Sequence, residues 1–441
     1  MTIFADGDSK SIMFQQRYNM IHQNILLDSR FTDSSRGSRG ADFPIISSKG
    51  NTEKARVNES SLLQMHTKGH AEAAWRVQLT PPESLSGSTG MKVVFGMLTK
   101  GADGKFFVED THQAAEVRLD NCGISDDLIT ENTFVLLKGE VVDDLFHASE
   151  MTIPPIPQLS LSEAALNVGA KHLLDEVRIG DPETDAPEDS SVAILAGVLL
   201  DKPQVLDKIN SLLTGFEECE AVPSVFVLMG NFLSTPFNAY NGDSCRAYQK
   251  GFEKLAIVLS RHPATLERTT IVLVPGQHEP GHGILPQPPL SDILLRGLAT
   301  RFSNVVLASN PCRLKYYNKN MVFYAGSISS TLQRNRLVCN YQSTDSQFDG
   351  DKIMRSVLSQ MSLVPGPVRD QAVIWDLDST LRLYPPPNAL YISDELAEVY
   401  QTELHRESLF ATMPKFASEE DLEAEFYLYS PHQKENTLSS V

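Results

Sequence analysis

The sequence predicts two kinds of fold in one chain, a small β-barrel followed by a larger α/β sandwich. Five short β-prone runs separated by turn residues lie within residues 91–157, and this spacing is typical of a five-stranded barrel. From residue 192 onward, apolar strands alternate with amphipathic helices, which is the pattern of a mixed sheet covered by helices. The predicted fold class is therefore α/β plus β, with the barrel packed on the α/β sandwich.

Length and charge narrow the classes of protein that the chain can be. A chain of 441 residues is too long for one hydrophobic core and suits two domains with connecting segments. Its apolar runs are shorter than the roughly 18 residues that a membrane span needs, and its N-terminus lacks the features of a signal peptide. We therefore expect a soluble, intracellular protein without membrane contact. The net charge of −18 argues against a main role in holding nucleic acid, because phosphate binding needs a basic surface.

The N-terminal segment, residues 1–32, is predicted to be an amphipathic helix. Between Phe14 and Ile25, large apolar side chains recur every third or fourth residue, which is helical spacing. Such a stripe is stable only when it is covered, so we expect the helix to pack on the part of the chain that follows. Residues 33–78 are rich in small and polar residues and are predicted to be a flexible connector.

Residues 79–157 form the predicted barrel. Its first strand contains an internal glycine, Gly96. Five strands with a glycine inside the first match an OB-fold, which is a five-stranded Greek-key barrel. The predicted strands are 91–99, 105–110, 115–120, 133–142 and 145–153.

The remaining chain is divided into a linker, the α/β domain and a tail. Residues 158–190 are predicted to contain a helix at 161–176 and an acidic, proline-containing loop. Residues 191–430 form the predicted α/β domain, and residues 431–441 the predicted tail. The predicted strands and helices of this domain are 192–196, 202–213, 224–229, 246–260, 269–274, 304–307, 321–324, 373–375 and 389–392.

The most informative feature is a pair of apolar strands that each end in a glycine turn. The first runs through Val225–Ser234 and places Gly-Asn after the strand; the second runs through Ile271–Pro280 and places Gly-Gln-His-Glu there. Open α/β sheets carry their chemistry at such strand ends. A two-metal phosphoesterase would have Gly-Asp at the first turn and Gly-Asn-His-Glu/Asp at the second, so the chain has the outline of a phosphoesterase.

The residues that would bind the metal ions are replaced. Gly197 and Leu199 stand where the pattern expects Asp-x-His, Asn231 replaces the bridging Asp, and Gln277 replaces Asn, although His278 is retained. A neutral amide cannot hold two divalent cations a few ångströms apart. We therefore predict no catalytic residue, no metal site and no enzymatic activity. An active metal-dependent phosphodiesterase is the weaker alternative.

No other cofactor site is predicted. The sequence contains no Walker loop, no GxSxG motif and no dinucleotide fingerprint. Its cysteines are scattered without a CxxC pair, which predicts reduced thiols rather than disulfides or a zinc site. They are Cys122, Cys219, Cys245, Cys312 and Cys339.

Single-stranded nucleic acid binding by the barrel is a further alternative. OB-folds bind single strands through exposed aromatic side chains in a basic groove. The alternation of residues places several of the aromatic candidates in the core, and the nearby cations are offset by carboxylates, so a structural barrel is the favoured interpretation. The aromatic candidates are Phe95, Phe106, Phe107, Phe134 and Phe146.

The chain is predicted to contain, in order, an amphipathic helix, an OB-fold and a phosphoesterase domain without metal ligands that resembles the calcineurin-like type. This order resembles the B subunits of the replicative B-family DNA polymerases, and among them the polymerase epsilon branch. The resemblance covers roughly residues 13 to 430. The segments that carry it are Phe14–Gln23, Leu79–Thr89, Gly104–Asp110, Val274–Leu290, Ser309–Tyr316 and Leu381–Pro387.

The resemblance implies a non-catalytic accessory subunit that works in the nucleus. B subunits of this family bind the C-terminal, cysteine-rich metal-binding region of the catalytic subunit, and they contact DNA and the other polymerase epsilon subunits through the complex. The helical domain that usually precedes the Phe14 helix in the epsilon branch is expected to be absent, because the chain begins about a dozen residues before that helix.

The proline- and glycine-rich segment from Pro275 to Leu290 is the candidate partner interface. A stiff segment loses little entropy on docking, but it would equally serve as a rigid loop that braces two domains. The candidate interface residues are Pro275, Gly276, His278, Pro280, Leu285, Pro286 and Leu290.

Overall fold

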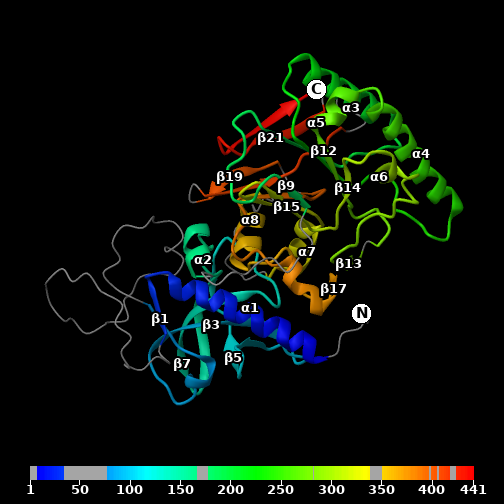
Figure 1. Ribbon diagram of the computed structural model, residues 1–441. Helices are drawn as coiled ribbons and strands as arrows, with labels where there is room; N and C mark the ends of the chain where they lie inside the picture. The colour runs from blue at the N-terminus through cyan, green and yellow to red at the C-terminus, as the bar shows by residue number, and fades with distance from the viewer. Residues whose placement is uncertain are drawn as a thin grey trace, which may run out of the picture.

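The computed structural model describes residues 7–33, 77–165, 177–281, 283–337, 350–396, 399–404, 407–417 and 424–441. Figure 1 shows a barrel with helix α1 in one part and two stacked sheets with helices in the other. The predicted combination of α/β and β structure is thus confirmed. None of the described helices is long and apolar enough to cross a membrane.

The barrel closes on itself. Strand β3 pairs with β4 and β7, β4 pairs with β5, β5 with β8, and β8 with β7. A Cβ atom on Gly96 would lie 2.6 Å from the carbonyl oxygen of Glu109, so the close approach of β3 and β4 requires glycine there. The five strands agree with the five that the sequence predicts. They are β3 (Met91–Lys100), β4 (Phe106–Glu109), β5 (Ala114–Arg118), β7 (Phe134–Val142) and β8 (Leu145–Thr152).

Helix α1 (Gly7–Leu27) covers one outer face of the barrel. Alternate residues of β3 point inward and outward, as strand geometry requires. Val94 and Leu98 fill the barrel interior, whereas Phe95 packs outside it in one cluster with Ile21 and Ile25 of α1. The expected burial of the helical stripe is therefore confirmed. The short elements around the barrel are β1 (Phe31–Asp33), β2 (Val77–Leu79), η2 (Pro82–Ser84), β6 (Gly123–Ile124) and α2 (Leu159–Ala165).

The first sheet of the α/β part contains four parallel strands. Its order is β14-β12-β11-β10-β21-β22, and β21 runs antiparallel to β10. The strands are β10 (Val192–Ala196), β11 (Val225–Met229), β12 (Thr270–Val274), β14 (Val305–Leu307), β21 (Glu425–Ser430) and β22 (Glu435–Ser440). Helices on its outer face are α3 (Pro203–Glu218), α4 (Gly242–Leu259), α5 (Pro263–Arg268) and α6 (Leu298–Arg301).

The second sheet lies against the inner face of the first. Its order is β19-β20-β18-β16-β15-β9. Its strands are β9 (Val177–Ile179), β15 (Cys312–Tyr316), β16 (Lys319–Ala325), β18 (Ala389–Ser393), β19 (Gln401–Leu404) and β20 (Ser408–Thr412). The other elements are β13 (Ile284–Leu285), α7 (Ile328–Asn335), α8 (Gly350–Ser359), β17 (Ala372–Val373) and η3 (Trp375–Leu381).

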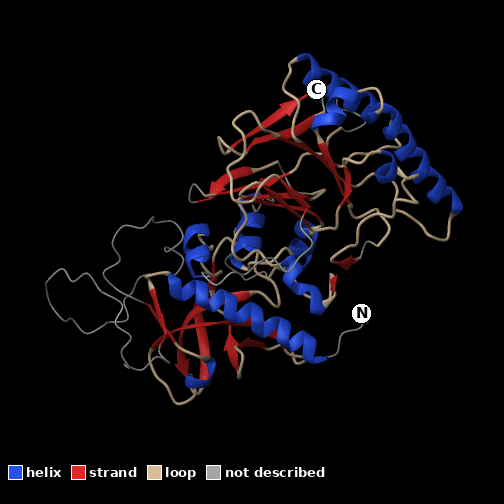
Figure 2. Ribbon diagram, viewed as in Figure 1, coloured by secondary structure: helices blue, strands red, loops and turns tan. Residues whose placement is uncertain are grey.

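The alternation of side chains along each strand builds three apolar layers. Leu195 of β10 packs under helices α3 and α4, whereas its neighbour Ile194 packs between the sheets against Phe323 and Tyr391. On the far face of the second sheet, Tyr324 and its neighbours pack against α7 and α8. Figure 2 shows the strands of both sheets between these helical layers. The α/β part is thus a four-layer sandwich.

Several predicted boundaries differ from the structure. The predicted tail is wrong, because residues 435–440 form strand β22, whose main chain pairs with β21. The predicted strand 373–375 stops at Val373, and a 3₁₀ helix begins at Trp375. Of the helix predicted at 161–176, residues 161–165 lie in α2, and residues 166–176 lie outside the described residues, as does most of the predicted connector. The four cysteines in the described ranges have free thiols, and Cys339 lies outside those ranges.

Polar contacts join the barrel to the second sheet's helices. The side chain of Gln360 accepts from the Phe134 backbone N–H at 2.7 Å and donates to the Phe134 carbonyl oxygen at 2.9 Å. Asp127, which is buried beside the barrel, accepts from Arg355 of α8 at 2.7 Å. These contacts fix the barrel against one end of the sandwich.

Candidate functional site

The candidate site is the edge of the first sheet where β10, β11 and β12 end. The three strands are parallel neighbours, so the turns that follow them meet at one edge. The Gly197 N–H donates to the carbonyl oxygen of Gly230, and the Gly230 N–H donates to that of Val274. The structure therefore brings together the turns that the sequence singled out.

A buried carboxylate, Glu279, holds two of these turns together. Its side chain is fully buried and accepts hydrogen bonds from the backbone N–H of Phe232, at 2.7 Å, and from that of Gly276. Burial raises the pKa of the Glu279 carboxyl, and the two N–H donors oppose that shift. From the sequence, Glu279 has no role beyond its place in the motif, because only the fold shows that it points inward.

Asn231 connects the two sheets. Its side-chain oxygen accepts from the His278 backbone N–H at 2.9 Å, and its side-chain nitrogen donates to Glu395, just beyond β18, at 2.9 Å. The nearby Gln277 side chain accepts from the Ser327 hydroxyl at 2.6 Å. Both amides are therefore engaged by the protein's own groups.

The other motif residues also serve structural roles. His278 donates from Nδ1 to the carbonyl oxygen of Leu233, 3.0 Å away. Gly197 adopts a φ of 65°, which suits glycine at a turn, and the half-buried Leu199 packs on the core beneath the helices. A Cβ atom on Gly276 would lie 2.6 Å from the Asn231 side-chain oxygen.

The donor set at this edge does not fit a two-metal centre. Glycine and leucine supply no side-chain donor, and Asn231 and Glu279 have their oxygens in hydrogen bonds. Across the described ranges, no group of three or more His, Cys, Asp or Glu side chains is placed to hold a metal ion. The chemistry available at this edge is hydrogen bonding and apolar contact.

The predicted interface segment is divided between buried and exposed residues. Leu285 packs with the α7 and α8 cluster and Leu290 with the α3 and α4 cluster, so neither is available to a partner in this conformation. Pro275 and Gly276 are buried too, whereas His278, Pro280 and Pro286 are half-buried. That this segment binds a partner stays a prediction, and its exposed residues are Gly281, Gly283, Ile284, Pro288 and Pro289.

Exposed apolar side chains lie close to the edge along the chain. Leu396 follows Glu395, the partner of Asn231, and is 59% exposed. Tyr240 is fully exposed in a loop whose Phe237 N–H donates to the carbonyl oxygen of His278 at 2.7 Å. Tyrosine is enriched among the residues that supply most of the binding energy of protein interfaces, and an exposed leucine adds apolar surface beside it. These two residues were not predicted from the sequence, because exposure depends on the tertiary fold.

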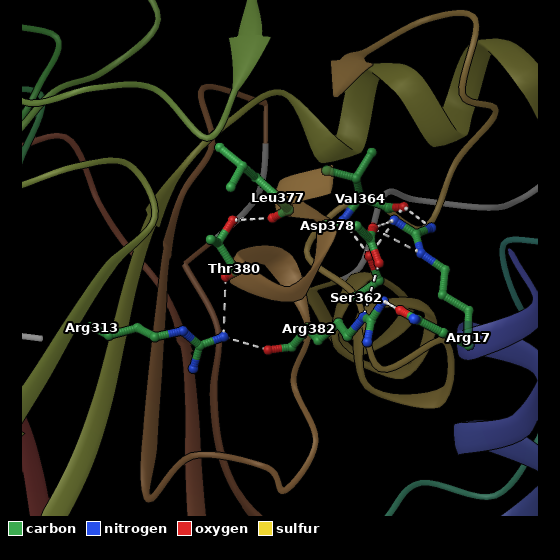
Figure 3. Close-up of polar contacts among 9 residues, drawn as sticks. Arg17, Arg313, Ser362, Val364, Leu377, Asp378, Thr380 and Arg382 are labelled. Carbon is green, nitrogen blue, oxygen red and sulfur yellow. Dashed lines mark hydrogen bonds and ion pairs between the residues drawn. The ribbon is translucent and has the colours of Figure 1, made fainter. Parts of the chain in front are cut away.

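The N-terminal helix is anchored by a second polar cluster, which was not predicted from the sequence either. Figure 3 shows Arg17 reaching from α1 to Asp378 of η3. Arg17 Nε donates to Asp378 Oδ1 at 3.1 Å, and Arg382 Nε donates to Asp378 Oδ2 at 2.9 Å. Arg313 of β15 donates to the Thr380 carbonyl oxygen at 3.2 Å. These groups tie α1 to the second sheet.

The outer aromatic face of the barrel is covered by α1. The ring of Tyr18 lies 4.9 Å from that of Phe95, and His22 stacks on Phe95 at 5.8 Å. Phe134 and Phe146 are buried, and Phe106 and Phe107 are half-buried. Most of the aromatic candidates for nucleic-acid stacking are therefore occupied by the protein itself.

Comparison with known families gives two matches. The family model for the B subunit of DNA polymerase alpha/epsilon matches residues 192–401, which contain the strand-end site. The model for the OB-fold domain of DNA polymerase epsilon subunit 2-like proteins matches residues 7–155, which contain α1 and the barrel. The predicted OB-fold is thereby confirmed.

Similar curated proteins come from plants, animals and fungi. The B subunit of DNA polymerase epsilon from Arabidopsis thaliana is 30% identical over 454 residues, covering 100% of this chain and 78% of the relative. DNA polymerase epsilon subunit 2 of Mus musculus is 29% identical, covering 89% of this chain and 69% of the relative. The B subunit of DNA polymerase epsilon from Saccharomyces cerevisiae is 22% identical, with 88% and 63% covered.

Solved structures resemble the chain only weakly. A novel archaeal phosphodiesterase gives a TM-score of 0.30 at 10% identity and covers 57% of this chain and 99% of its own. A dimetal phosphatase from Danio rerio gives 0.31 at 9% identity, with 58% and 96% covered.

Proposed function

The chain belongs to the family of DNA polymerase epsilon B subunits, and on this basis we propose that it is the non-catalytic second subunit of DNA polymerase epsilon. Its place in the family rests on the relative that is 30% identical across the whole chain. Within the complex, it binds the C-terminal, cysteine-rich region of the catalytic subunit and stabilises that region in chromosomal replication. It works in the nucleus and meets DNA through the complex.

The observation that carries the non-catalytic role is the internal use of the strand-end residues. Asn231 bonds to His278 and Glu395, and the Glu279 carboxylate bonds to the two turns. In an active phosphoesterase these positions would face metal ions and a phosphate. We therefore regard the sandwich as a calcineurin-like phosphoesterase domain whose catalytic edge has been converted into a protein-binding edge.

The polymerase partner is proposed to contact the exposed rim of this edge. Leu396 and Tyr240 supply apolar contact area, and Ile284, which is partly exposed in the proline-rich segment, adds to it. The hydrogen bonds beneath them hold the loops in place before binding, which reduces the ordering cost. The buried Leu285 and Leu290 support the segment from below.

The test is binding of the full-length chain to the C-terminal region of the polymerase epsilon catalytic subunit from the same source. We expect Leu396→Asp to weaken binding by roughly tenfold or more, the effect of losing one well-buried interface contact. Val142→Asp is the matched control, because Val142 is exposed to a similar degree but lies on the barrel. No binding by the wild-type chain would refute the accessory role, and equal binding by the two variants would refute the proposed edge.

The phosphodiesterase alternative is tested on the same preparation. We expect no manganese-dependent hydrolysis of a model phosphodiester above the buffer rate, since the donor set does not fit two cations. Hydrolysis that is lost on changing Asn231 or His278 would overturn the non-catalytic assignment. The single-strand-binding alternative has no comparable support, because α1 covers Phe95 and Phe134.

A further inference from the structure

Helix α4 has a basic outer side on an otherwise acidic chain. Arg246, Lys250 and Lys254 follow one another at intervals of four residues, so they lie along one side of the helix. Arg261 follows just after the helix ends. The same stretch contains only two carboxylates, Asp243 and Glu253, whereas the whole chain has a net charge of −18. The basic side therefore stands out from the general charge.

These cations are available for binding. Arg246 pairs with Asp243, and both side chains are well exposed to solvent. Among the residues that the structure describes, Lys250, Lys254 and Arg261 form no ion pair. The helix beneath them is firmly packed, since its opposite side is buried in the core. Figure 1 shows α4 at the periphery of the α/β part, away from the barrel.

An apolar residue stands among the cations. Ile257 is 49% exposed and lies three residues after Lys254 and seven after Lys250, on the same side of the helix. The stretch from Arg246 to Ile257 is about 17 Å long at the usual helical rise, or three turns. An isoleucine in this position offers nothing to a phosphate backbone but suits an apolar side chain of a protein.

We propose that the outer side of α4 binds an acidic, amphipathic segment of a partner protein. The partner's carboxylates contact Lys250, Lys254 and Arg261, and one of its apolar side chains covers Ile257. Charge complementarity identifies this occupant. The positive side of α4 attracts an acidic segment, whereas the net negative charge of the rest of the chain repels it. A nucleic acid fits less well, since Ile257 and Glu253 interrupt the cations and the chain as a whole carries a net charge of −18.

The experiment places a photo-crosslinking amino acid at position 257 of the full-length chain, expressed in its own cells with its native partners. We expect a crosslink to a peptide that carries several carboxylates around a large apolar residue. The yield should fall steeply as salt rises from about 0.05 to 0.5 M, because screening shortens the range of exposed charges.

The matched variants decide the role of the cations. K250E/K254E/R261E should lower the crosslink yield by at least about tenfold, since three attractive contacts become repulsive. K10E/K100E/K434E changes the net charge equally at exposed positions elsewhere and should leave the yield unchanged. Equal thermal midpoints of both variants and the wild type show that folding is intact, and K250E alone provides a milder second variant. The proposal would be overturned by a crosslink to DNA or RNA, or by a crosslink to a peptide without carboxylates. An unchanged yield in K250E/K254E/R261E, or no crosslink at all, would also overturn it.

Discussion

Removal of the Asp378 carboxylate is expected to destabilise the protein by about 3 kcal/mol, because it leaves a buried arginine without its charge partner. Asp378 is 1% exposed and accepts from both Arg17 and Arg382. In Asp378→Ala, the buried Arg17 would keep its long hydrogen bond to the Val364 carbonyl oxygen, at 3.4 Å, but it would lose the carboxylate that balances its charge. Breaking a buried ion pair in this way costs about 3–5 kcal/mol. Arg382 is more exposed and can turn to water, so the lower end applies.

The assay is urea unfolding followed by circular dichroism, with hydrogen exchange of the α1 amides as a local measurement. Exchange in α1 should accelerate in Asp378→Ala, because Arg17 is its polar anchor to η3. Asp243→Ala is the control, since the Arg246–Asp243 pair is solvent-exposed and should contribute less than about 1 kcal/mol. A double-mutant cycle with Arg17→Ala should give a coupling energy of about 2 kcal/mol. A loss below about 1 kcal/mol, or strictly additive single effects, would refute the reasoning.

Two further predictions concern the strand-end region. Leu285→Ala should lower the free energy of unfolding by about 2–4 kcal/mol through the cavity it leaves, whereas Ile284→Ala at the exposed neighbouring position should change it by less than about 0.5 kcal/mol; similar losses in both variants would contradict the observed burial. For Glu279, the folded pKa is raised above its ordinary value of 4.5, so its contribution to stability is greatest below that pH and is lost as the pH rises through the folded pKa. The stability of Glu279→Gln should therefore fall less than that of the wild type between pH 4 and pH 7.5. The substitution also lowers stability at every pH by about 1–3 kcal/mol, because one buried N–H loses its acceptor. Parallel pH profiles for the two proteins in urea unfolding would contradict this prediction.

The elements of the fold were predictable where a local pattern determines them. The apolar runs of β3, β7, β10, β11 and β12 follow from burial on both faces of these strands. The stripe from Phe14 to Ile25 likewise identified α1. Strand β22 was missed because its six residues, Glu435–Ser440, are mostly polar and exposed; it forms by backbone pairing with β21, which no side-chain pattern reports.

The site was predictable in its position and not in its contacts. Glycine turns after apolar strands located the edge, since parallel neighbours end together. Glu279 turns inward to bond with Phe232, which lies 47 positions away in the sequence. Asn231 bonds to Glu395, which lies 164 positions away. The same holds for Arg17 and Asp378, which are 361 positions apart. The solvent exposure of Leu396 and burial of Leu285 are also consequences of long-range packing, so the sequence could name the interface segment but not its accessible side chains.

The hydrogen bonds at the strand ends explain how an edge of this kind keeps its shape without metal ions. In a two-metal centre, the cations hold the turns together by binding ligands from several strands. Here the Glu279 carboxylate accepts from Phe232 after β11 and from Gly276 after β12, and Asn231 extends the connection to Glu395 in the second sheet. The glycines at 230 and 276 allow this close approach, because a Cβ atom at Gly276 would collide with Asn231. The turns are thus held by protein groups alone, and the loops that carry Tyr240 and Leu396 start from fixed positions. An edge held in this way is pre-organised for a protein partner, which is the property that the proposed accessory role requires.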